Sequence, residues 1–297
     1  MNKIFLRPIA CCCSVLILTS CATTRFDTRN ELTQGINSNY IAIDEVSVGD
    51  WITYIVTTSF TADYKTIKLG DHLDKIQSKL PVLKPGGWSH YTINAFLRNS
   101  QKNVSVDFYN DCKGHIIKIE VAKTAWDSIR KYQLLDLPIA GITYEQARHY
   151  IGYKQYLSNS CALKTKDQYR YECFLPTPEE FASVQTAMDS LNNQGCNLFN
   201  YKNSFCADCP NGKKLKNHPV FNRTGTEPTY VWAYFPDPFG VKNFKGNVAE
   251  MTSIKGIAEG GSCMHYAFEA FNGRRQEYLG SATWLGLRVW YKKIPKS

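Results

Sequence analysis

The chain has 297 residues, of which 43% are hydrophobic, and its 35 Lys and Arg against 26 Asp and Glu give a formal charge of +9. This length can bury one large core or two small ones. The charge is modest, and no run of basic residues is interleaved with aromatic residues, so the composition does not favour a nucleic-acid-binding protein. We interpret the lysine clusters at 213–216 and 292–296 as solvated surface.

The first 20 residues have the pattern of a signal peptide. Lys3 and Arg7 form a short basic region, and residues 9–18 are mostly apolar. This run is too short to cross a bilayer, which needs about 20 apolar residues. Residues 18–21 read Leu-Thr-Ser-Cys, which resembles a bacterial lipobox and predicts cleavage before Cys21 and lipid attachment to it. The alternative is an ordinary secretory peptide with an incidental cysteine.

The residues after the predicted lipidation site indicate where the protein is exported. Residue 22 is Ala, whereas the usual inner-membrane retention signal has Asp there. We therefore expect an outer-membrane lipoprotein of the bacterial cell envelope. The sequence does not indicate whether it lies on the periplasmic face or on the surface face of that membrane. Residues 21–37 are polar and show no apolar period, which predicts a tether. Residues 38–293 are expected to form one domain.

Seven cysteines follow the predicted lipidated one, and an envelope location permits disulfides. Because the count is odd, at least one thiol stays unpaired or pairs with another chain. Cys206 and Cys209 have the spacing of redox and zinc motifs, but Pro210 follows them and no second pair has zinc-ribbon spacing, which favours a structural crosslink or loop staple. The sequence leaves open the pairing of Cys112, Cys161, Cys173, Cys196, Cys206, Cys209 and Cys263.

The first half of the chain predicts strands and short helices in turn. Apolar residues alternate with other residues at 41–43, as in a strand, and apolar residues have helix-like spacing at 50–56. Residues 69–80 are a plausible short helix. Residues 104–108 and 115–121 alternate around a turn, which predicts a hairpin.

The second half predicts two helices followed by a long irregular region. Residues 143–157 form the clearest amphipathic pattern, in which Thr143 can cap the helix and Gln146 completes a capping box. Thr177 is the predicted N-cap of another helix, with Pro178 at its first position. Residues 196–247 are mostly irregular but rich in aromatic residues and cysteine, which is typical of loops that hold a ligand, metal or partner. We expect an α+β fold, loop-rich with little regular secondary structure.

Three segments near the C-terminus read Gly-Asn-Val-Ala-Glu at 246–250, Gly-Gly-Ser at 260–262 and Gly-Leu-Arg at 286–288. Their order resembles the signature of the formylglycine-generating enzyme, or sulfatase-modifying factor, family. The resemblance covers residues 41–292 and implies the family fold, a C-type-lectin-like variant, whereas residues 57–137 match poorly and are interpreted as divergent or inserted. The fold-signature residues are Gly246, Gly260, Gly261, Ser262, Gly286 and Arg288.

Asn247 and Glu250 are candidate ligands of a structural calcium ion. They lie three residues apart and offer the hard oxygen atoms that calcium prefers. Members of the family that the chain resembles place structural calcium around this block. The alternative is that both side chains only cap local turns.

The resemblance also bears on catalysis. Active members of the family bind copper(I) with two cysteines that follow the Gly-Gly-Ser turn, because copper(I) demands soft thiolate ligands. Here His265 and Ala270 occupy these positions, and Cys263 lies two residues before the first of them. Copper is therefore not expected, and the chain resembles the gliding-motility and secretion-associated lipoproteins that carry this domain without the cysteine pair.

The expected function is that of a non-catalytic binding or scaffold module, anchored to the bacterial membrane by its lipid, whose partners are other envelope proteins or glycans and not nucleic acid. The alternative is a metal-dependent oxidase or oxygenase of the same family that uses Cys263 and His265 as metal ligands.

Overall fold

The computed structural model describes eight segments of the chain. They are residues 39–60, 66–82, 87–98, 100–109, 116–191, 228–232, 239–265 and 275–296. The predicted signal peptide, Cys21 and the tether lie outside the described residues. The same is true of four cysteines, Cys112, Cys196, Cys206 and Cys209.

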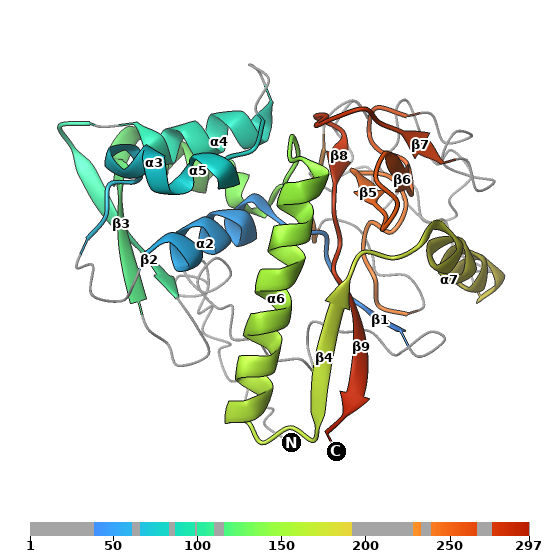
Figure 1. The fold of residues 1–297 in the computed structure, drawn as a ribbon. Helices are drawn as coiled ribbons and strands as arrows, with labels where there is room; N and C mark the ends of the chain where they lie inside the picture. The colour runs from blue at the N-terminus through green and yellow to red at the C-terminus, as the bar shows by residue number, and fades with distance from the viewer. Residues whose placement is uncertain are drawn as a thin grey trace, which may run out of the picture.

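The described residues combine helices and sheets, so the α+β class is confirmed (Figure 1). The helices are α2 (Val48–Ser59), α3 (Leu73–Ile76), α4 (Trp88–Leu97), α5 (Lys123–Lys131), α6 (Tyr144–Lys164) and α7 (Pro178–Leu191), with 3-10 turns η2 (Leu69–His72), η3 (Gln77–Lys79) and η4 (Leu134–Asp136). The strands are β1 (Asn39–Ile41), β2 (Asn103–Tyr109), β3 (Ile116–Ala122), β4 (Tyr169–Phe174), β5 (Ala249–Met251), β6 (Ile257–Glu259), β7 (Gln276–Glu277), β8 (Leu285–Gly286) and β9 (Trp290–Pro295).

The strands form three separate sheets. One has the order β1-β9-β4 with antiparallel neighbours, so it joins the start and the end of the described chain. The second is the predicted hairpin β2-β3, in register from Asn103 opposite Ala122 to Tyr109 opposite Ile116. The third has the order β7-β6-β5-β8, in which β5 and β8 are parallel. It carries the signature segments.

Two helices begin where the sequence predicted. Thr143 caps α6, and Gln146 completes the capping box, with both reciprocal hydrogen bonds present. The helix extends to Lys164, seven residues beyond the predicted end, because Leu157, Cys161 and Ala162 continue its buried face. Figure 1 shows α6 running beside β4 through the middle of the molecule. Helix α7 starts at Pro178, as predicted.

The N-terminal helices differ in extent from the sequence prediction. Helix α2 covers residues 48–59, longer than the predicted 50–56, because Ser47 and Asp50 form an unexpected capping box. Residues 69–80 form the succession η2, α3 and η3, because the backbone departs from helical geometry at His72, whose φ is −128° and ψ is 33°.

The poorly matching region shares a core with the rest of the molecule. Residues on α4, β2 and β3 belong to the same buried apolar cluster as Trp51 of α2 and Tyr150 of α6. The Trp51 and Tyr150 rings stack with centroids 5.3 Å apart. A smaller cluster packs Phe181 of α7 against Phe244 and Trp290. None of the helices among the described residues is both long enough and apolar enough to cross a membrane.

Candidate functional site

The signature segments lie together in the structure. Gly246 donates its N–H to the carbonyl oxygen of Gly260 at 2.8 Å, and both residues have a φ of +84°. Gly261 follows with a φ of +67°. A Cβ atom on Gly260 would lie 3.0 Å from the carbonyl oxygen of Phe244. The Gly-Gly turn therefore needs glycine for its backbone conformation and also for the close approach of another segment.

Gly286 is required by a different close approach. It lies in β8, in parallel register with Glu250 of β5. An added Cβ atom would lie 2.7 Å from a Val248 methyl carbon and 2.9 Å from the Ile139 carbonyl oxygen. The first and third signature segments thus pack directly against each other, with no room for a side chain.

Glu45 is the centre of a buried hydrogen-bonding network. Asn247 donates through Nδ2 to Glu45 Oε2 at 2.6 Å, and Asn243 donates to the same oxygen at 3.3 Å. The N–H of Val248 donates to Glu45 Oε1 at 3.3 Å. Asn247 also accepts the N–H of Thr229 through Oδ1 at 2.8 Å. The opening segment of the domain is therefore fixed to the first signature segment by one carboxyl group.

Arg288 and Glu250 form a completely buried ion pair. The Nε atom of Arg288 donates to Glu250 Oε1 at 2.7 Å, and both side chains are at most 1% exposed. Burial raises the pKa of Glu45 to about 8, although the positive charge of Arg288 acts to lower it. Burial also raises the pKa of Glu250. The guanidinium nitrogens NH1 and NH2 bind the backbone carbonyl groups of Ala42, Ile43 and Lys242.

These contacts bear on the predicted calcium site. Asn247 Oδ1 already accepts a backbone N–H, and Arg288 covers one oxygen of Glu250. The other, Glu250 Oε2, is buried without a hydrogen-bond partner among the described residues. One carboxylate oxygen falls short of the six to eight oxygen ligands that calcium takes. The described side chains do not by themselves fit this site, and calcium binding stays a prediction.

Cys263 lies inside the protein. The residue is 0% exposed, and its backbone N–H donates to the Asn247 carbonyl oxygen at 2.9 Å. A metal that activates a substrate needs a ligand beside an open position. The depth of Cys263 does not provide such a position.

His265 is held by its own turn. Its Nδ1 atom lies 2.7 Å from Ser262 Oγ, and Ser262 also accepts the N–H of Met264 at 3.1 Å. The imidazole edge packs on the Trp284 ring, with centroids 4.8 Å apart. In the described part of the chain, no group of three or more His, Cys, Asp or Glu side chains is arranged to hold a metal ion.

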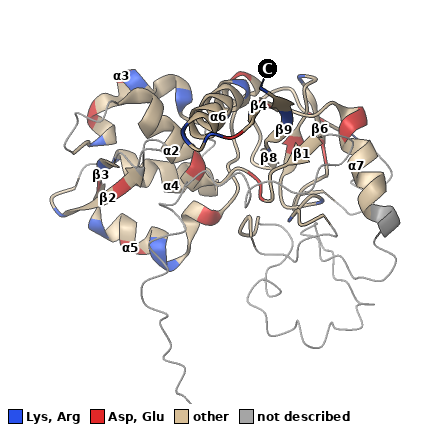
Figure 2. Cartoon of the chain, turned by 90° about the horizontal axis from the view of Figure 1, so that it is seen from below, with Lys and Arg blue, Asp and Glu red and all other residues tan. Residues whose placement is uncertain are grey.

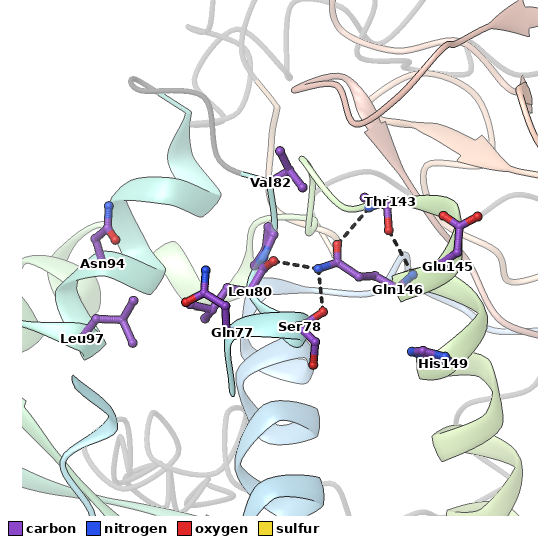
Figure 3. A pocket seen from close by; sticks show the side chains of 11 residues that line it. Gln77, Ser78, Leu80, Val82, Asn94, Leu97, Thr143, Glu145, Gln146 and His149 are labelled. Atoms are coloured by element: carbon purple, nitrogen blue, oxygen red, sulfur yellow. Dashed lines mark hydrogen bonds between the residues drawn. The ribbon is translucent and has the colours of Figure 1, made fainter. Parts of the chain in front are cut away.

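A separate cleft of about 570 Å³ opens between α4 and the start of α6 (Figure 3). Residues 77–82 form one wall, Asn94 and Leu97 come from α4, and the first turns of α6 complete the lining. Gln146 connects the walls, since its Nε2 donates to the Ser78 and Leu80 carbonyl oxygens at 3.0 and 2.7 Å. The volume is within the range of small-molecule sites, about 300–1,000 Å³.

The cleft has the lining of a site for uncharged ligands. Among the residues that the structure describes, the lining holds no Lys or Arg, and its carboxylate, Glu145, pairs with Lys255 at 2.6 Å. The lining includes the side-chain amides of Gln77 and Asn94, the imidazole of His149 and the apolar side chains of Leu80, Val82 and Leu97. Such a surface accommodates hydroxyl and amide groups attached to an apolar body.

The sequence did not reveal this cleft or the role of Asn243. The cleft joins residues from three separate segments, and no local motif marks them. Asn243 has a φ of +53°, which is uncommon outside glycine, and it donates to the Val231 carbonyl oxygen at 2.9 Å. An asparagine between Lys242 and Phe244 in an irregular stretch was the available signal, because asparagine tolerates this conformation better than other residues.

Comparisons with known proteins give a limited result. No family model matches the chain, and no curated protein matches it. Among solved structures, the chain is similar to one titled "Structure of PvdO from Pseudomonas aeruginosa", at 15% identity and a TM-score of 0.34, over 53% of this chain and 63% of that chain. The chain thus matches under two thirds of that protein. One titled "Crystal Structure of CarF" is 12% identical over 87% of each chain, with a TM-score of 0.40. At such low TM-scores, neither likeness carries an argument.

Proposed function

We propose that this protein is a lipid-anchored binding module of the bacterial cell envelope, built on a catalytically degenerate domain similar to formylglycine-generating enzyme. Lipid on Cys21 would hold it at the outer membrane, and other envelope proteins or glycans would be its partners. The order of the three signature segments and the close packing of Gly246, Gly260 and Gly286 support the family assignment.

One observation carries the non-catalytic part of the proposal, namely the complete burial of Cys263. An oxidase using Cys263 and His265 would need both ligands beside a position open to oxygen and substrate. The Cys263 thiol is inside the core, and the His265 ring is engaged by Ser262 and Trp284. These contacts explain both residues as parts of the fold.

The cleft beside α6 supports the binding part of the proposal. Its walls are joined by Gln146, so it is preformed and does not have to be organised by a ligand. Its amide-bearing and apolar lining suits the uncharged polar groups of a glycan or a peptide segment of another envelope protein.

The proposal is tested first on the purified full chain. Copper is quantified by mass spectrometry, and oxidation of a cysteine-containing peptide is followed in the presence of oxygen and added copper(I). We expect neither stoichiometric copper nor peptide oxidation. Copper bound one to one together with oxidation that is lost in Cys263→Ala would overturn the proposal in favour of the oxidase.

The binding role is tested with chemical crosslinking of the full chain in envelope preparations. Ser78→Trp places a large ring at the exposed wall of the cleft, and Thr124→Trp on the exposed side of α5 is the matched control. We expect Ser78→Trp alone to lose crosslinked partners or bound glycans. Equal crosslinking by the two variants would exclude the cleft as the binding site. Metabolic labelling with palmitate, compared with Cys21→Ser, tests the lipid anchor separately.

A further inference from the structure

The end of α6, the start of β4 and the end of β9 lie at one end of the molecule (Figure 1), and these segments are rich in Lys and Arg. Hydrogen bonds tie these chain segments together. The N–H of Asp167 donates to the Ala162 carbonyl oxygen at 2.8 Å, and the N–H of Lys296 donates to the Gln168 carbonyl oxygen at 2.9 Å. The antiparallel register then places Lys293 opposite Tyr171. Segments far apart in the sequence therefore meet at this end of the molecule.

This surface, here called the basic face, is strongly cationic. Figure 2 looks onto this end of the molecule, with basic ribbon segments beside α6 and β9. Two carboxylates lie in or beside it. Asp167 is half-buried and accepts hydrogen bonds from the Tyr169 N–H at 3.1 Å and the Tyr171 hydroxyl at 2.7 Å, and the exposed Glu172 of β4 lies opposite Lys292. The basic face is defined by Lys164, Lys166, Arg170, Lys293 and Lys296.

An exposed apolar side chain stands within the basic face. Leu163, next to Lys164 on the last turn of α6, is 70% exposed. Lysine and arginine around an exposed leucine are the composition of surfaces that lie at a membrane interface, because the cations meet phosphate groups while the apolar side chain enters the headgroup boundary.

The start of the described chain lies toward the same end. Asn39 of β1 is opposite Lys292 of β9, and the two strands are antiparallel. The chain therefore enters β1 from the side on which β9 continues to Lys293 and Lys296. The Lys293 Nζ atom also lies 4.2 Å from the centre of the Tyr40 ring in β1. A lipid attached before this strand would hold the basic face close to the bilayer.

We infer that the basic face docks on the anionic phospholipid headgroups of the membrane that anchors the protein, and so orients the domain with its opposite end away from the bilayer. The role of the lipid in this inference depends on the proposed function, whereas the attraction of the basic face to anionic lipid does not.

The size of the effect follows from the number of cations. Each Lys or Arg near an anionic bilayer strengthens binding roughly fivefold at moderate ionic strength. The tether predicted between Cys21 and Asn39, treated as a random coil, would keep the domain within roughly 20–25 Å of the surface on average. At that distance even a weak contact is occupied much of the time, because tethering raises the effective concentration of the partner.

The test is flotation of the full chain carrying Cys21→Ser with two kinds of vesicle, phosphatidylcholine alone and phosphatidylcholine with phosphatidylglycerol. The readout is the gain in binding that phosphatidylglycerol causes, because the apolar segment at 9–18 contributes to both vesicles alike. We expect the triple variant Lys164→Glu, Lys166→Glu, Arg170→Glu to reduce this gain at least about tenfold. We also expect 0.5 M salt to abolish the gain, because it shortens the Debye length roughly fivefold relative to dilute buffer.

The matched control reverses three exposed lysines outside the basic face, Lys75, Lys102 and Lys131. It should bind phosphatidylglycerol vesicles nearly as well as the parent chain. A triple glutamine variant at 164, 166 and 170 guards against a folding defect, and it should lose the gain with an unchanged circular dichroism spectrum.

Equal loss in the two reversed variants, or no gain with phosphatidylglycerol in the parent chain, would overturn the inference. The same would follow if double-stranded DNA bound through the basic face while vesicles did not. Palmitate labelling at Cys21 is scored separately, so a missing lipid anchor and a missing headgroup contact give different results.

Discussion

The signature region and the hairpin region of this protein are stabilised in different ways. In the signature region, irregular segments around β5 and β8 are held by the buried side chains of Glu45, Asn247, Glu250 and Arg288. In the hairpin region, residues 66–131, regular helices and the β2-β3 pair are held by apolar packing around Phe96, and the ion pairs are at the surface.

The difference follows from how the backbone N–H and C=O groups of each region are hydrogen-bonded. Helices and paired strands satisfy their own N–H and C=O groups, so the hairpin region needs only an apolar face to pack. The signature segments have few such internal bonds, and Arg288 supplies donors to three carbonyl groups that secondary structure does not reach. We infer that buried charge specifies the loop-rich region, whereas hydrophobic burial specifies the regular one.

Replacement of Arg288 should have the largest effect. Arg288→Met keeps much of the side-chain volume but removes the donors to Glu250 and to the carbonyl groups of Ala42 and Lys242, while the Ile43 carbonyl keeps the Lys242 N–H. Removing one partner of a buried ion pair costs about 3–5 kcal/mol. We expect a loss of this size in the free energy of unfolding, measured by urea denaturation. Arg148→Met, at an exposed position on α6, is the control, and equal losses in both variants would contradict the comparison.

A methyl group at Gly286 should destabilise the same region. The new Cβ would lie too close to Val248 and to the Ile139 carbonyl oxygen, and overpacking of this kind costs about 1–3 kcal/mol. Gly280→Ala is the matched control, since nothing lies within 4 Å of its added Cβ. Thermal unfolding should separate the two variants. Equal melting temperatures in the two variants would contradict the claim that β8 leaves no room for a side chain at Gly286.

The buried carboxyl of Glu45 should make stability depend on pH. Its pKa is raised from 4.5 to about 8 in the folded protein, so the folded state binds this proton more tightly than the unfolded state does. The resulting stabilisation is complete below pH 4.5 and is lost as the pH rises toward 8. We expect the free energy of unfolding to fall across this window by about 1.4 kcal/mol for each unit by which the pKa of Glu45 is raised.

Glu45→Gln separates this contribution from that of the other buried carboxyl groups. Burial also raises the pKa of Glu259, to about 7, so some pH dependence should remain in the variant. The amide keeps an oxygen to accept from Asn247, and the slope of stability against pH should be shallower than in the parent chain. Identical slopes would show that Glu45 does not titrate in this window.

Removal of a surface ion pair in the hairpin region should have the smallest effect. Asp127→Asn breaks the contact with Lys123, which is 2.6 Å long between side chains that are each 55% exposed. Such pairs contribute less than about 0.5 kcal/mol. A loss above 1 kcal/mol in urea denaturation, roughly the upper limit for exposed pairs, would mean that charge matters as much here as in the signature region.

Local signals in the sequence were sufficient where a short segment determines its own structure. The capping box of Thr143 and Gln146 fixed the start of α6, and alternation at 104–108 predicted β2. The signature glycines were found because close packing leaves no other residue possible. The lengths of α2 and α6 were underestimated, since the Ser47–Asp50 capping box sets the start of α2 and the buried face of α6 continues to Ala162.

The sequence by itself determined the α+β class, the hairpin and the helix starts, because each depends on chemistry within a few residues. Only the tertiary structure decided that Cys263 is buried, that Glu45 meets Asn247, and that the cleft beside α6 and the basic face exist. Each of these features joins segments that are distant in the chain, and burial and pairing across such distances depend on how the whole core packs.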